Sequence, residues 1–166
     1  MPFNYYHRLS RRDQRAYRES DGVATISLPR AGDLASSVQA VRSALGAEDR
    51  PALRLACQEF VDAVNDQLHA PPSNVRVLAA RPSRNWGELH GLYEPLDGTA
   101  SARITVWMRT AKRRQVVAFR SFFRTVLHEL CHHLDYEHLA LAESFHTEGF
   151  FKRESSLFHQ LVTTDP

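Results

Sequence analysis

Apolar side chains recur every three or four positions in four stretches of the chain, which predicts four amphipathic helices. These stretches are residues 33–45, 51–70, 116–139 and 149–162. Asp33 is expected to cap the first helix, and Gly46 to end it. Pro51 stands at a favoured first-turn position of the second helix, and Pro71 and Pro72 should stop it.

Between the second and third helices the apolar pattern shortens to every second position, which predicts strands. The three candidates are residues 75–81, 88–93 and 102–109. In the last of them Ile104 and Val106 alternate with Thr105, and Asp97-Gly98 marks a turn before it. Helices, a small sheet and further helices in this order predict an α+β fold, with a small antiparallel or mixed sheet packed on the helix at residues 116–139.

The 166 residues are enough for one domain with its own core. Residues 1–22 are expected to form a basic N-terminal helix or arm, and residues 23–166 the main domain. No apolar run approaches the roughly 18 residues that would span a bilayer, and no apolar signal segment starts the chain. Cys57 and Cys131 are too few for a disulfide framework. We therefore expect a cytoplasmic protein that has no membrane partner.

Positive charge is concentrated before the last quarter of the chain. Residues 1–127 hold 19 Lys+Arg against 12 Asp+Glu, whereas residues 128–166 hold 2 against 7. Seven bases and no acid lie between Asp97 and Glu129. A solvated basic face is the favoured interpretation of residues 103–124, and a surface for nucleic acid or an acidic substrate is the less favoured alternative.

The sequence His-Glu-Leu-Cys-His at residues 128–132 carries the clearest chemical signal. On a helix, positions i and i+4 share one face, so His128 and His132 can bind one metal ion. Glu129 is next to the first histidine and can reach a water molecule at that ion. The helical stripe leaves both histidines off the core face, and a strand candidate precedes the helix. The pattern predicts a Zn²⁺ site with Glu129 as its general base.

A catalytic zinc ion takes three protein ligands and keeps one position open. We favour His146 as the third ligand, because it lies between a predicted helix end and the next helix start, where the chain can return to the ion. The alternatives are His138, Glu143 and Glu148. His138 follows the motif at the spacing of H-E-x-x-H-x-x-G-x-x-H, although Asp135 stands at the glycine position.

Several other polar residues lie near the motif. Asp135 either orients a ligand histidine through a hydrogen bond or faces water. Cys131 is expected to be a buried apolar residue, and His133 a packing or solvent residue. The side chains that could approach the metal and stabilise an oxyanion are Tyr93, Tyr136, Arg153, Glu154 and His159.

Over about residues 52–162 the chain resembles the SprT-like branch of the zincin metallopeptidases. The matching features are a strand pair at residues 91–93 and 104–108, the motif at residues 127–132, and His-Thr-Glu-Gly-Phe at residues 146–150. The family usually has glycine directly after the third histidine, where this chain has Thr147.

This resemblance implies a zincin-like domain that hydrolyses peptide bonds in a peptide or protein substrate. His128, His132 and His146 would bind Zn²⁺, and Glu129 would be catalytic. The strand at residues 104–108 is expected to pair with extended substrate. The alternative functions are a catalytically silent zinc-binding module and a nucleic-acid-associated protein that uses residues 103–124.

Overall fold

The computed structural model describes residues 1–85, 87–98 and 100–162. Its elements within these residues are η1 Asn4–Arg8, α1 Arg11–Asp21, η2 Ala31–Leu34, α2 Ala35–Gly46, α3 Arg50–Leu68, β1 Ser73–Ala80, β2 Ser83–Arg84, β3 Gly87–Glu88, β4 Gly91–Glu94, β5 Ala102–Arg109, α4 Phe119–Glu137 and α5 Glu148–Leu161. The fold is α+β with a small mixed sheet, as predicted. No helix of the described part is long and apolar enough to cross a membrane. The last four residues of the expected main domain, 163–166, lie outside the described residues.

The main sheet has the strand order β1-β5-β4. β1 runs parallel to β5, and β4 runs antiparallel to it, with Gly91 opposite Val106. The expected alternation of buried and exposed positions in β5 is wrong, because Thr105 and Trp107 are buried as well. β5 is the central strand, and neighbours on both edges shield its side chains. β4 forms an edge of the sheet, next to α4.

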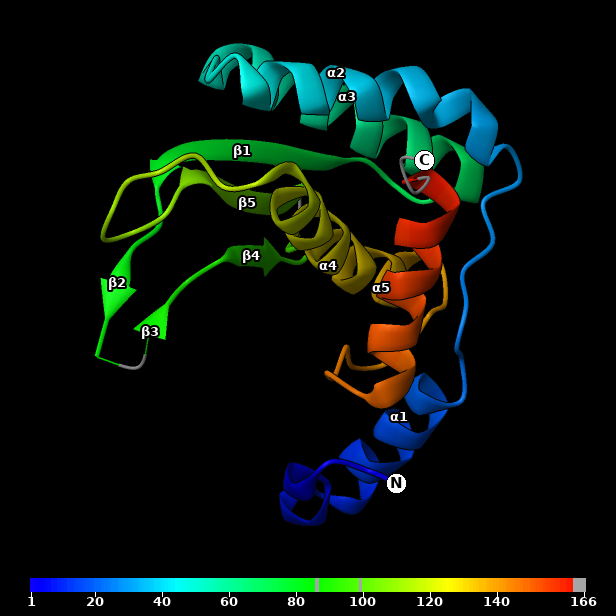
Figure 1. Ribbon diagram of the computed structural model, residues 1–166. Coiled ribbons are helices and arrows are strands. Elements are labelled where there is room, and N and C mark those ends of the chain that lie inside the picture. The colour runs from blue at the N-terminus through cyan, green and yellow to red at the C-terminus, as the bar shows by residue number, and fades with distance from the viewer. Residues whose placement is uncertain (86, 99, 163–166) are drawn as a thin grey trace.

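Figure 1 shows α2 and α3 side by side above β1. α4 lies against the sheet, and α5 lies beside α4. α3 packs on β1, and α4 packs on β4, β5 and α5. The core therefore lies between the helices and one face of the sheet. It contains Val75 and Val77 of β1, Ile104 and Val106 of β5, and Phe60 of α3. Burial of this apolar surface stabilises the arrangement that carries the site.

The second strand candidate, residues 88–93, is divided in the structure. Glu88 ends β3 of a short hairpin, and Gly91–Glu94 forms β4. Two helix starts were also misplaced. α2 follows η2, so Asp33 does not cap it and instead pairs with Arg30 at 3.4 Å on the surface. α4 begins at Phe119 because Val116 is held in a β-bridge to Arg109.

α3 ends at Leu68, before the two prolines that were expected to stop it. Its C-cap is His69, which is exposed and has a left-handed backbone with φ 56°. The backbone N–H of His69 donates to the carbonyl oxygens of Asn65 and Asp66, and the backbone N–H of Ala70 also donates to the Asn65 oxygen at 2.9 Å. A left-handed turn therefore directs the chain from α3 toward β1.

His69→Gly should stabilise the protein by about 0.5–1 kcal/mol, because glycine adopts a positive φ without steric cost. The matched control is Ala47→Gly at the C-cap of α2, where φ is −79° and glycine should only destabilise. Urea unfolding shows whether each substitution raises or lowers the free energy of unfolding. If both substitutions destabilise the protein, the His69 side chain contributes more stability than its left-handed backbone conformation costs.

Candidate metal centre

The three motif residues, His128, Glu129 and His132, all lie on α4 and line an open cleft. Its core face is made by Phe123, Leu127, Leu130 and other apolar residues that are fully buried. His128 and His132 are half-buried and lie off this stripe, one turn apart. The prediction that His128 and His132 lie off the core face of this helix is confirmed.

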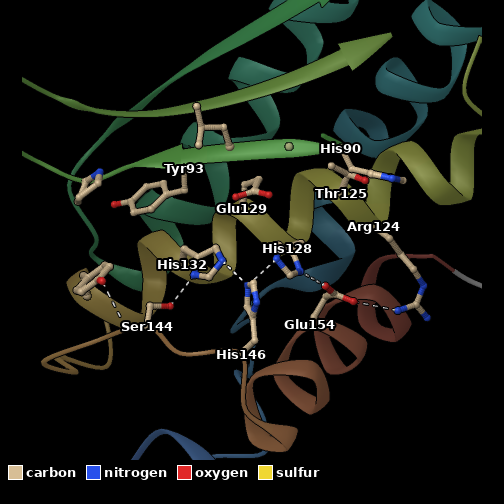
Figure 2. A pocket seen from close by; sticks show the side chains of 14 residues that line it. His90, Tyr93, Arg124, Thr125, His128, Glu129, His132, Ser144, His146 and Glu154 are labelled. Atoms are coloured by element: carbon tan, nitrogen blue, oxygen red, sulfur yellow. Dashed lines mark hydrogen bonds and ion pairs between the residues drawn. The ribbon is translucent and has the colours of Figure 1, made fainter. Parts of the chain in front are cut away.

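His146 comes from the loop between α4 and α5 and completes the cluster (Figure 2). Its Nε2 atom lies 3.1 Å from Nε2 of His128 and 3.0 Å from Nε2 of His132. The three ligand atoms are all within 4.8 Å of one another. Tetrahedral zinc with Zn–N bonds of about 2.0–2.1 Å would separate two ligand nitrogens by about 3.3 Å. The three histidines therefore lie close enough to bind one metal ion.

The hydrogen bond of His128 leaves a lone pair at its Nε2 atom. Its Nδ1 lies 2.8 Å from Oε1 of Glu154. A carboxylate only accepts hydrogen bonds, so Nδ1 of His128 carries a hydrogen and a metal ion would be coordinated through Nε2. Glu154 also accepts from Arg124 at 3.4 Å, and it was among the residues that the sequence suggested near the metal.

His132 is oriented in the same sense through a hydroxyl group. Its Nδ1 lies 2.7 Å from Oγ of Ser144, and that hydroxyl donates to Oδ2 of Asp135 at 2.7 Å. Ser144 Oγ therefore accepts from His132 Nδ1–H, which again leaves Nε2 with a lone pair. Asp135 thus orients His132 indirectly, through Ser144. Ser144 lies in a loop, and the helical spacing gave no signal for it.

Asp135 is held in turn by Arg153 of α5. The Nη2 atom of Arg153 lies 3.0 Å from Asp135 Oδ2, and both side chains are completely buried. Arg153 also donates to the carbonyl oxygens of Ser20 and Val23, both at 2.6 Å. Burial raises the pKa of Asp135, whereas Arg153 and Ser144 oppose that shift. Arg153 therefore supports the structure and does not face the cleft.

Burial sets the protonation of the site. It lowers the pKa of His132 to about 3, with further lowering from His128 and His146, and it also lowers the pKa of His146. Neutral rings with free lone pairs are the form that binds metal. Burial raises the pKa of Glu129 to about 7; Glu154 adds to this shift and His128 opposes it. A carboxyl group with a pKa in this range can take up and return a proton near neutral pH.

The other proposed third ligands lie elsewhere. His138 is exposed, and its Nδ1 bonds the carbonyl oxygen of Leu68 at 3.1 Å. Glu148 pairs with Lys152 at 3.1 Å in the first turn of α5. Glu143 lies 3.5 Å from the Tyr136 hydroxyl. Among the described residues, none of these belongs to the group that could hold a metal ion.

Of the remaining candidates, Cys131 and His133 are buried in the protein and His159 is exposed. Cys131 is buried, as expected. Nε2 of His133 donates to the carbonyl oxygen of Pro71 at 2.7 Å, so its Nδ1 accepts from the Tyr93 hydroxyl at 2.9 Å. His159 is exposed on α5 and does not line the cleft.

A cleft of about 580 Å³ opens over the three histidines. β4 forms one wall, through Gly91, Leu92 and Tyr93, and α4 forms another. Beneath the cluster the fully buried ring of Phe150 lies 4.7–5.2 Å from all three imidazoles, centroid to centroid. Phe150 belongs to the segment that resembles the SprT-like family but was assigned no role there, and in the structure its ring packs against all three imidazoles.

No protein-family model, curated protein or solved structure matches this chain. The chemical interpretation of the cluster therefore rests on the positions and hydrogen bonds of its own residues.

His146→Ala should weaken metal binding, whereas His138→Ala should leave it unchanged. His146→Ala removes one of three converging nitrogens, so we expect zinc affinity to fall by more than the roughly 10–100-fold that loss of an outer hydrogen bond costs. His138→Ala should keep one zinc per chain. Elemental analysis of the purified proteins and a chelator competition measure both. Loss of zinc from His138→Ala alone would contradict this ligand set.

Proposed function

We propose that the protein is a zinc-dependent metallopeptidase of the zincin type, in which His128, His132 and His146 hold Zn²⁺ and Glu129 is the general base. The observation that carries the proposal is the convergence of three imidazole Nε2 atoms, each on a half-buried or exposed ring, at the floor of an open cleft that also contains Glu129. The SprT-like resemblance supports the same assignment.

The donor set fits zinc. Imidazole nitrogens suit Zn²⁺, and both helix histidines are fixed in the tautomer that coordinates through Nε2. Structural zinc sites are usually closed by a fourth protein ligand, whereas the described residues supply three and the cleft stays open. When bound, the ion supplies Lewis-acid chemistry that acidifies water and polarises a carbonyl group. An open site of this kind favours catalysis over a silent zinc-binding module.

Glu129 is placed to move protons at the scissile bond. Its side chain points into the cleft between His128 and β4 (Figure 2), and the residue is only 6% exposed. In the proposed mechanism the carboxylate takes the proton of the attacking water and delivers it to the leaving amine. Low exposure keeps bulk water from competing for that proton.

An extended substrate would bind along β4. The expectation that residues 104–108 pair with substrate is wrong, because β5 already pairs with β1 on one edge and β4 on the other. β4 is the edge strand, and it lines the cleft. Peptides commonly add to such an edge through backbone hydrogen bonds. This geometry supports a peptide or unfolded protein segment as the substrate.

Both tyrosines that line the cleft, Tyr93 and Tyr136, already donate their hydroxyl hydrogen to a neighbouring residue. Tyr93 donates its hydrogen to His133, outside the cluster. Tyr136 lines the cleft, and its oxygen accepts from the backbone N–H of Ser144 at 3.3 Å, beside the hydroxyl that orients His132. Because the Tyr136 hydroxyl also donates to Oε2 of Glu143 at 3.5 Å, neither tyrosine is assigned the role of stabilising an oxyanion.

The basic stretch at residues 103–124 does not present uniformly unpaired charge. Arg103 pairs with Glu94 at 3.0 Å, Arg109 with Glu48 at 2.9 Å, and Arg124 with Glu154 at 3.4 Å. These acids come from other parts of the sequence. The pairing favours the solvated-face interpretation over a nucleic-acid surface.

Glu129→Gln should bind zinc as tightly as the unmodified protein but lose hydrolysis by about 10²–10⁴-fold, because the amide cannot accept the proton of the attacking water. The assay uses the zinc-loaded protein and an unfolded protein substrate, with zinc content measured in parallel. Full activity in the zinc-loaded Glu129→Gln protein would refute the proposed mechanism.

Gly91→Ala tests the placement of Glu129 separately. A Cβ atom at Gly91 would lie 2.6 Å from Oε1 and 2.9 Å from Cγ of Glu129, and 2.8 Å from Cγ2 of Thr125. We expect kcat to fall by about 10²-fold, the effect of displacing a reacting group by roughly 1 Å, with zinc affinity unchanged.

The control for this substitution is Gly32→Ala. A Cβ atom there meets nothing within 4 Å, and φ is not positive, so this variant should keep the unmodified kcat. Equal kcat values for Gly91→Ala and Gly32→Ala would mean that the close approach of β4 does not hold Glu129.

A further inference from the structure

The N-terminal segment, residues 1–23, lies against the loop that carries His146. The Tyr5 hydroxyl donates a hydrogen bond of 2.6 Å to the backbone carbonyl oxygen of His146 itself. The Tyr5 ring is fixed by neighbours on its own segment, at 5.6 Å from Tyr17 and 6.5 Å from Phe3, centroid to centroid. A rigid aromatic group of the N-terminal segment thus contacts a residue of the metal cluster directly.

Two more contacts hold the residues that follow His146. The backbone N–H of Gly149 donates to Oδ1 of Asp21 at 2.9 Å, and the hydroxyls of Ser20 and Thr147 lie 3.4 Å apart in a buried contact. Gly149 permits this approach, because a Cβ atom there would lie 2.6 Å from the Asp21 carbonyl oxygen. Thr147, where the SprT-like family usually has glycine, also caps α5 by accepting from Phe150 N–H at 2.9 Å.

His146 depends on such backbone contacts more than the other two histidines do. Nδ1 of His128 bonds Glu154, and Nδ1 of His132 bonds Ser144. Among the described residues, Nδ1 of His146 has no hydrogen-bond partner that would fix its ring. His146 also lies in a loop, without the regular hydrogen bonds that fix the helix histidines. Apart from the packing of its ring against Phe150 and Phe151, the position of His146 therefore depends on its backbone and on the groups that hold that backbone.

We infer that Tyr5 is a positioning residue for the metal site, and that the N-terminal segment completes the site by fixing His146. The inference rests on the metal cluster of the proposed function, but not on peptide hydrolysis. It also gives a role to a part of the chain in which the sequence showed only a basic helix or arm.

The test measures zinc affinity of the full chain by competition with a chromophoric chelator, in Tyr5→Phe and in the control Tyr6→Phe. Tyr6 is the adjacent tyrosine, and its hydroxyl accepts from Arg18 instead of contacting the loop. Tyr5→Phe should weaken zinc binding by about three- to tenfold, the range expected for one hydrogen bond, and Tyr6→Phe should not weaken it. Both variants keep their rings, and the unfolding midpoint of the metal-free proteins checks their folds.

Cobalt(II) provides a readout that a purely structural role would not change. The visible spectrum of the Co²⁺-loaded protein reports ligand geometry, so it should differ from that of the unmodified protein in Tyr5→Phe and be the same in Tyr6→Phe. Unchanged affinity and spectrum in Tyr5→Phe, or equal losses in both variants, would overturn the inference while leaving the metal site intact. Failure of the unmodified protein to bind zinc would overturn the proposed function and this inference together.

Discussion

The buried ion pair between Arg153 and Asp135 connects the scaffold to the metal site. It joins α5 to α4 with both side chains excluded from water, and the same guanidinium binds the end of α1 through Ser20. Losing one partner of such a pair typically costs about 3–5 kcal/mol, because the other charge stays buried without compensation. Three helices are therefore held at fixed positions by one guanidinium group. Ser144 and His132 are oriented from this fixed point.

The two helix histidines are supported in similar ways by different atoms. His128 is bound to Glu154, which contacts Arg124, and His132 is bound to Ser144, which contacts Asp135. In both cases an arginine ends the chain of contacts and the histidine ring presents Nε2 to the cleft. The charges of Glu154 and Asp135 are thus each balanced by an arginine. The space above the histidines remains available for a metal ion and a substrate.

The α+β class and the motif residues could be predicted because helical and strand periods are local properties of the sequence. His128 and His132 share a face through spacing alone, and His146 was favoured because of its place between two helices. The order of strands could not be predicted in this way, since the alternation in residues 102–109 is the same for an edge or a central strand. Ser144 and Tyr5 were also missed, because they act through contacts between loops and distant segments.

The contact between Tyr5 and His146 joins positions at opposite ends of the chain, and so do those between Arg153 and the end of α1. During synthesis, residues 1–23 are made long before residues 146–153, so these contacts cannot form until the later residues follow. α2 and α3 are neighbours in sequence and can pair early, whereas closing such long loops is slow. Assembly of the three-histidine cluster is therefore a late folding event. A nascent chain that stops before residue 146 contains the HExxH helix without the third histidine of the cluster.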